Sequence, residues 1–162
     1  MKTLKNSSLI MLSLLAIALS SCQPKLAKFS YLFSMESVMN YKIILTIDSD
    51  KQYRIEEQRI FEDKSENKKE PIIVEGVLTD VQLEAFKVAI EKSRLDKMHD
   101  SYGFEEDAES NKDRDLIYQV NLETPDIQKY ISIRQTHTKL FDQSFIDLLK
   151  LSSNFADKKL KD

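Results

Sequence analysis

The strongest fold signal in this chain is Tyr41-Lys42-Ile43-Ile44-Leu45-Thr46-Ile47-Asp48-Ser49-Asp50-Lys51-Gln52-Tyr53-Arg54-Ile55. Every second residue of its first half is apolar, which is the period of a β-strand with one buried face. Asp48-Ser49-Asp50 is a typical turn sequence, and the alternation resumes at Tyr53. The stretch therefore predicts an antiparallel hairpin. After Ile55 two successive polar residues, Glu56 and Glu57, shift the apolar phase, so we expect a β-bulge there.

Strand patterns also occur on both sides of this hairpin. Residues 29–36 place Phe29, Tyr31, Phe33 and Met35 on one face. Residues 72–78 are short and rich in β-branched side chains, and residues 116–134 form a second hairpin divided by Thr124-Pro125-Asp126. The chain thus contains about six predicted strands.

Two segments have the period of amphipathic helices. The first begins after Thr79, which has Gln82 three residues on as a capping box requires, and Leu78 and Leu83 occupy the positions of a hydrophobic staple. Its buried face consists of Leu83, Phe86 and Ile90. The second helix is expected from about Thr138, with an apolar face of Phe141, Phe145, Leu148 and Leu149.

The order is strand, hairpin, strand, helix, hairpin, helix, and the short connections favour an antiparallel sheet. Each of the two helices is apolar on one face and must bury that face, so we expect both to pack on one face of the sheet. The fold class is therefore α+β, with a single domain over residues 29–155 and a polar tail at residues 156–162.

The N-terminus has the composition of an export signal. Lys2 and Lys5 precede an apolar run at residues 9–19, and Leu19-Ser20-Ser21-Cys22 contains the single cysteine of the chain. These four residues resemble the lipobox of bacterial lipoproteins. The resemblance implies that Leu19, Ser20 and Ser21 are recognised by the signal peptidase, that residues 1–21 are removed, and that Cys22 carries the lipid. Residues 22–28 would then be a short lipidated tether.

Two alternatives compete with the lipoprotein hypothesis. An uncleaved transmembrane helix is disfavoured, because the apolar run rises only about 16 Å at 1.5 Å per residue, against a hydrocarbon core of about 30 Å. A plain secretory signal is also disfavoured, because the position of the single cysteine directly after Ser20 and Ser21 would then be a coincidence. In lipoproteins the residues after the cysteine guide sorting, and Gln23 is not the acidic residue associated with inner-membrane retention. We therefore expect the outer membrane rather than the inner membrane as the location.

Composition limits the possible partners. The chain has 24 Lys and Arg against 27 Asp and Glu, and removal of a leader containing Lys2 and Lys5 makes the remainder more acidic. A net acidic surface disfavours nucleic acid and anionic headgroups, so the expected membrane contact is the lipid on Cys22. A protein or another component of the envelope is the other expected partner, with an envelope protein as the named candidate.

The sequence offers few candidates for catalysis or metal binding. The loop at residues 102–115 gathers acidic side chains, but an EF-hand read from Asp107 would place Lys112 where glycine is needed. His99 and His137 lie at helix ends without the spacing of a metal template. Hydrolase and phosphate-loop motifs are absent from the sequence. We therefore expect a non-enzymatic domain without a cofactor or metal, the alternative being a metal-dependent or enzymatic periplasmic module that uses residues 102–115.

The tyrosines raise a second binding hypothesis. Tyr41, Tyr53, Tyr118 and Tyr130 lie on predicted strands, where they either pack in the sheet or form an exposed aromatic surface. Alternation places Tyr130 opposite to its apolar neighbours, so it is the best candidate for exposure. The chain also resembles a family of small exported bacterial domains of unknown function over about residues 29–150. The resemblance rests on the run Tyr41-Lys42-Ile43-Ile44-Leu45-Thr46-Ile47 followed by a second strand, on Leu78-Thr79 opening a helix, and on Tyr102 and Asp115 ahead of a hairpin. That resemblance implies no activity.

Overall fold

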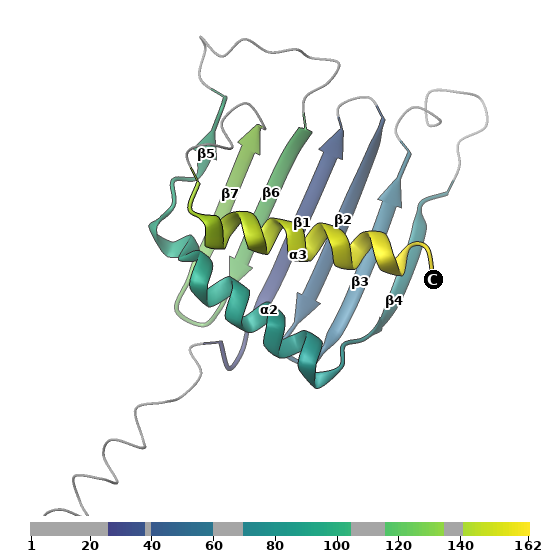
Figure 1. The fold of residues 1–162 in the computed structure, drawn as a ribbon, viewed down its shortest axis with the longest axis horizontal. Coiled ribbons are helices and arrows are strands. Elements are labelled where there is room, and N and C mark those ends of the chain that lie inside the picture. Colours follow the sequence, from purple (N-terminus) through teal and green to yellow (C-terminus); the bar gives the residue numbers. More distant parts are fainter. Residues whose placement is uncertain (1–25, 38–39, 60–69, 105–115, 135–140) are drawn as a thin grey trace, which may run out of the picture.

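The structure is a computed structural model that describes residues 26–37, 40–59, 70–104, 116–134 and 141–162 (Figure 1). It is an α+β fold, as predicted. Its elements are, in chain order, β1 (Ser30–Ser37), β2 (Tyr41–Asp48), β3 (Gln52–Gln58), β4 (Ile72–Val77), α2 (Asp80–Ser93), the 3₁₀ helix η2 (Leu95–Lys97), β5 (Ser101–Tyr102), β6 (Leu116–Glu123), β7 (Gln128–Arg134) and α3 (Gln143–Lys159).

The strands form one sheet in the order β4-β3-β2-β1-β6-β7-β5. All neighbours are antiparallel except β5, which runs parallel to β7. The first strand of the domain lies in the middle, with Tyr31 opposite Ile47 on one side and Leu122 on the other. The sheet has seven strands rather than about six, because β5 is only two residues long and has no alternation to detect.

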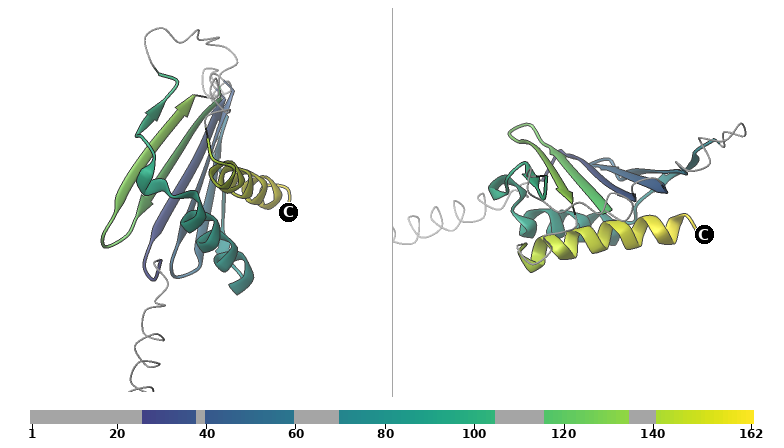
Figure 2. Two further views of the ribbon diagram at one scale, coloured as in Figure 1. Left: turned by 60° about the vertical axis from the view of Figure 1, so that its left-hand side comes forward. Right: turned by 90° about the horizontal axis from the view of Figure 1, so that it is seen from above.

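Both helices lie on the same side of the sheet, as expected (Figure 2). They bury the face that carries Tyr31, Phe33, Leu45 and Ile55, each with no exposed surface. The helices contribute Phe86, Ile90, Phe145 and Leu148 to the same core. Among the described residues, the other face of the sheet therefore has no covering layer.

The 41–55 hairpin forms as predicted. Asp48 accepts hydrogen bonds at Oδ1 from the backbone N–H groups of Asp50 and Gln52, at 2.9 and 3.0 Å. Lys51 completes the turn in the left-handed region with φ of 67°. The predicted bulge after Ile55 is wrong, because β2 and β3 stay in register through Glu56 and Glu57 to Gln58.

Three boundaries also differ from the predicted ones. Leu26, which we placed in the tether, is 4% exposed and belongs to the core, so the packed domain begins before residue 29. Helix α3 begins at Gln143 rather than near Thr138 and continues to Lys159. Ala156 in the predicted polar tail is fully buried, because the apolar face of α3 extends over the sheet to that point.

Candidate functional site

In the described part of the chain, no helix covers the face of the sheet opposite α2 and α3 (Figure 2). The strand register places on it the side chains that alternate with the core residues. We call this surface the open face. Its central residues are Leu32, Ser34, Ile44, Thr46, Arg54, Glu56, Glu75, Gln119, Asn121 and Tyr130. They are mostly polar, so a partner of this face would be recognised by hydrogen bonds and charge.

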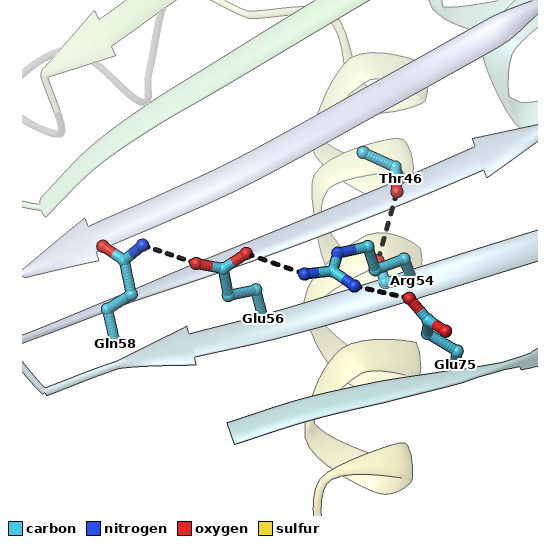
Figure 3. A network of polar contacts seen from close by, with 5 residues as sticks. All are labelled: Thr46, Arg54, Glu56, Gln58 and Glu75. Carbon is cyan, nitrogen blue, oxygen red and sulfur yellow. Dashed lines mark hydrogen bonds and ion pairs between the residues drawn. The ribbon is translucent and has the colours of Figure 1, made fainter. Parts of the chain in front are cut away.

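A polar network centred on Arg54 crosses β3 and reaches β4 (Figure 3). The Arg54 guanidinium donates to Glu75 on β4 and contacts Glu56 at 3.5 Å. Gln58 donates from Nε2 to the other oxygen of Glu56 at 2.6 Å. The backbone carbonyl of Arg54 accepts a hydrogen bond from the Thr46 hydroxyl at 3.4 Å. The network thus holds one cation between two carboxylates.

The electrostatics of this network favour the charged form of arginine. The hydrogen bond to Glu75 raises the pKa of Arg54 above its ordinary value, and desolvation opposes this. Because the Arg54 and Glu75 side chains are 44% and 62% exposed, solvent screens the pair and its contribution to stability is small. What the network provides is a group of neighbouring charges of both signs on the open face.

A hollow of about 440 Å³ lies beside this network. Its lining includes Thr46, Asp48, Arg54 and Glu75, with Ser30 and Gln52 at the end of the strands. Its charged lining groups all have partners: Asp48 accepts two backbone hydrogen bonds at Oδ1, and Arg54 is paired with Glu75. The hollow suits a small polar or basic group better than an apolar one.

Tyr53 lies on the helix side of the sheet. Its ring meets Phe155 of α3 edge to face, with 5.2 Å between centroids. A Cβ added to Gly76 would come within 2.6 Å of the Tyr53 hydroxyl, so glycine lets β4 approach this ring closely.

The other tyrosines follow the expectation of sheet packing. Tyr118 lies 6.2 Å from Phe33 between ring centroids, and burial, with a smaller effect of Tyr41, raises the pKa of Tyr118. Tyr41 is partly buried against the core. Tyr130 is 47% exposed on the open face, which confirms that it is the best candidate for exposure. Of these four tyrosines, the sheet therefore exposes one ring, Tyr130, among polar neighbours on its own and the adjacent strand.

A second hollow of about 450 Å³ lies where α2 ends and α3 begins. Met98, Tyr102, Phe141 and Phe145 form its apolar lining, and the Tyr102 and Phe141 rings meet edge to face at 4.9 Å. Arg94 and Lys97 lie at its rim. Sequence analysis missed this hollow because two segments that are distant along the chain, residues 93–102 and residues 141–145, build it together.

His99 lies at this end of the molecule, exposed, with its backbone N–H donating to the Tyr102 hydroxyl at 2.8 Å. His137, residues 105–115 of the acidic loop, and the predicted lipobox Leu19-Ser20-Ser21-Cys22 lie outside the described residues. Within the described ranges, no three His, Cys, Asp or Glu side chains come together as a metal site would require. The structure therefore leaves the metal hypothesis for residues 102–115 untested.

Sequence reasoning also missed the Arg54 network. Glu75 lies far from Arg54 in the sequence, and only the pairing of Arg54 with Glu75 across β3 and β4 brings them together. A hairpin prediction spanning residues 52–77 with its register would have found this pair.

Comparison with known proteins adds no assignment: no protein-family model matches the chain, and no curated protein matches it significantly. Among the helices of the described residues, none has the length and apolar character needed to cross a membrane.

Proposed function

We propose that this protein is a bacterial envelope lipoprotein, anchored through a lipid on Cys22, whose non-enzymatic domain binds another envelope protein. The observation that carries the anchor is the sequence Leu19-Ser20-Ser21-Cys22 after an apolar run. Gln23 favours the outer membrane as the location. Two or more acyl chains hold a protein stably on a membrane, whereas one holds it only reversibly.

The position of Leu26 supports a close association with the membrane. Since Leu26 is buried in the core, only residues 23–25 separate Cys22 from the packed domain. At about 3.4 Å per residue, the four steps from Cys22 to Leu26 reach roughly 14 Å. The turn at Asp48–Lys51 and the turn after Glu123 lie at the same end, because Ser30 is opposite both Asp48 and Glu123. The strands thus lead away from the anchored end.

The open face supports the binding role. A sheet with helices on one side and a pattern of charge on the other offers a rigid, preformed surface, and rigidity reduces the entropy lost on binding. Arg54, Glu56 and Glu75 form that pattern. The mixed charges suit a protein surface better than a polyanion.

The first arm of the test concerns the anchor. We expect Cys22→Ser to abolish the mass increase of lipidation and to release the protein from the membrane fraction, because serine has no thiol to alkylate. Ser21→Ala keeps a small residue before the cysteine and serves as the matched control. Intact mass and membrane fractionation measure both. An unmodified thiol in the mature wild-type protein would contradict the proposal.

The second arm concerns the open face. A photo-crosslinking residue in place of Tyr130 should form one defined adduct with an envelope protein in intact cells, and Arg54→Glu should weaken that adduct. The same crosslinker in place of Glu91, which is exposed on α2, is the control. Equal adducts from both positions would show that the open face has no special role.

A further inference from the structure

The two edges of the sheet differ in how they meet solvent. The β5 edge is only two residues long, and a short edge strand is a common protection against unwanted pairing. The β4 edge is six residues long, and within the described residues no strand pairs with its outer side. Ile72, Ile73 and Val77 on it are 45%, 46% and 63% exposed. The β4 edge therefore lacks the lysines and the short length that usually protect an edge.

The backbone of β4 shows which groups are free to pair. Leu78 donates its N–H to the carbonyl of Lys51 at 2.8 Å, so the backbone at this position is directed toward β3. Successive residues of a strand direct these groups to opposite sides, and the β3–β4 register is continuous. The N–H and C=O groups of Ile73, Glu75 and Val77 are then directed outward. Pro71 lies at an outward-directed position as well, so the N–H that proline lacks is not one that would pair with β3.

We propose that the β4 edge accepts an extended segment of the envelope partner as an added antiparallel strand. The proposal rests on the proposed function for the nature of the partner. Main-chain hydrogen bonds to Ile73, Glu75 and Val77 supply affinity in this mode of recognition, and the side chains supply specificity.

The chemistry of the edge specifies the segment. Residues directly opposite one another in an antiparallel pair lie on the same face, so Ile73 and Val77 require apolar, β-branched neighbours. Glu75 requires a basic neighbour on the added strand. The side chains that lie side by side across β3, β4 and the added strand would then alternate in charge, from Arg54 through Glu75 to the partner's basic residue. Read from its own N-terminus, the segment has an apolar residue opposite Val77, any residue opposite Gly76 and a basic residue opposite Glu75. Apolar residues follow opposite Val74 and Ile73.

Symmetry argues against a second copy of the chain as the occupant. Antiparallel pairing of two β4 strands relates the two copies by a two-fold axis, so their anchored ends lie at opposite ends of the joined sheet. The eight residues of β1 span about 26 Å at 3.3 Å per residue, whereas residues 22–26 reach about 14 Å. One membrane could hold both anchors only if the charged open face or the helices lay flat on it, which the net charge of −3 disfavours on anionic headgroups.

Binding of a labelled peptide to the full chain in detergent micelles tests this proposal. The probe is Val-Thr-Arg-Val-Ile-Thr with a fluorescent label, measured by anisotropy. Ile73→Pro should weaken binding by about tenfold or more, because it removes an outward N–H without touching the β3 ladder. Ile73→Thr keeps the N–H and is the matched control, with a loss of about threefold from the smaller apolar contact. Circular dichroism melting confirms that both variants fold.

A charge exchange provides a second, independent measurement. Glu75→Lys should weaken binding of the arginine peptide and restore binding to a peptide with glutamate in place of arginine. Equal binding to wild type and Ile73→Pro, or a dimer in sedimentation without peptide binding, would overturn the proposal. Because the peptide measurement does not depend on the anchor, an unlipidated Cys22 with intact peptide binding would refute only the proposed location.

Discussion

Tyr31 is the largest fully buried side chain of the central strand, and its polar end has a partner. Ser152 of α3 donates its hydroxyl hydrogen to the Leu148 carbonyl at 2.9 Å, so the Tyr31 hydroxyl must donate to Ser152 Oγ, also at 2.9 Å. This pair links β1 to α3 across the core. Burial raises the pKa of Tyr31 above its ordinary value, and the hydrogen bond to Ser152 opposes this only in part.

The raised pKa predicts a pH dependence of stability. Below the unfolded pKa of about 10 the phenol is neutral in both states. Above it the unfolded chain ionises while folded Tyr31 does not, so stability falls as pH rises toward the folded pKa. Tyr31→Phe should cost about 1 kcal/mol at pH 8 from the lost hydrogen bond, and should reduce the alkaline slope by about 1.4 kcal/mol per pH unit. Urea unfolding between pH 8 and pH 11 measures both, and an unchanged alkaline slope would contradict the assignment.

At the scale of elements, α2 shows how a local signal fixes a boundary. The Thr79 hydroxyl accepts the Gln82 N–H at 3.2 Å, and the Thr79 N–H donates to the Gln82 side chain at 2.9 Å. This capping box is the predicted one, and Leu78 and Leu83 beside it are both buried. All the groups involved lie within one turn of the chain, which is why the sequence was sufficient.

Loss of the cap should therefore be measurable. Thr79→Ala removes the acceptor for the Gln82 N–H and is expected to lower the free energy of unfolding by about 1 kcal/mol. Glu84→Ala, on the exposed side of the same helix, should change it by less than about 0.5 kcal/mol. Chemical denaturation at neutral pH compares the two, and equal effects would show that the cap is not a stabilising feature.

The pairing of β3 with its two neighbouring strands explains why the predicted bulge after Ile55 does not form. Glu56 and Glu57 break the alternation in the sequence, yet β3 continues because it is paired along both sides, with β2 and with β4. Glu56 contacts Arg54, and Glu57 contacts Arg59 at 3.1 Å. Hydrogen bonds to two neighbouring strands outweigh the weak intrinsic preference of glutamate against strands.

At the scale of the whole molecule, β1 joins two halves that are distant in sequence. It pairs with β2 next along the chain and with β6 beyond α2. Because β1 is bordered on both sides and covered by α3, its amides can exchange only when the whole sheet opens. The amides at the β4 edge need only local opening.

Native-state hydrogen exchange should show this gradient. Amides of Phe33 and Leu45 are expected to exchange with the free energy of global unfolding, and the outward amides of Ile73 and Val77 much faster. Gly76, whose amide is directed toward β3, is the internal control within β4 and should be slower than Ile73. Equal protection of Ile73 and Gly76 would mean that the β4 edge is covered, which would also weaken the proposal of strand addition.

The features that could be predicted from the sequence have local causes: the two hairpins, the cap of α2, the apolar faces of both helices and the α+β class. Each depends on residues within a turn or a strand length, so their period and spacing are visible without coordinates. The tertiary structure alone decided that β1 is central, that Leu26 and Ala156 belong to the core, and that Arg54 meets Glu75. These depend on which strands pair over long separations, and pairing is selected by the burial of the whole sheet rather than by any one segment.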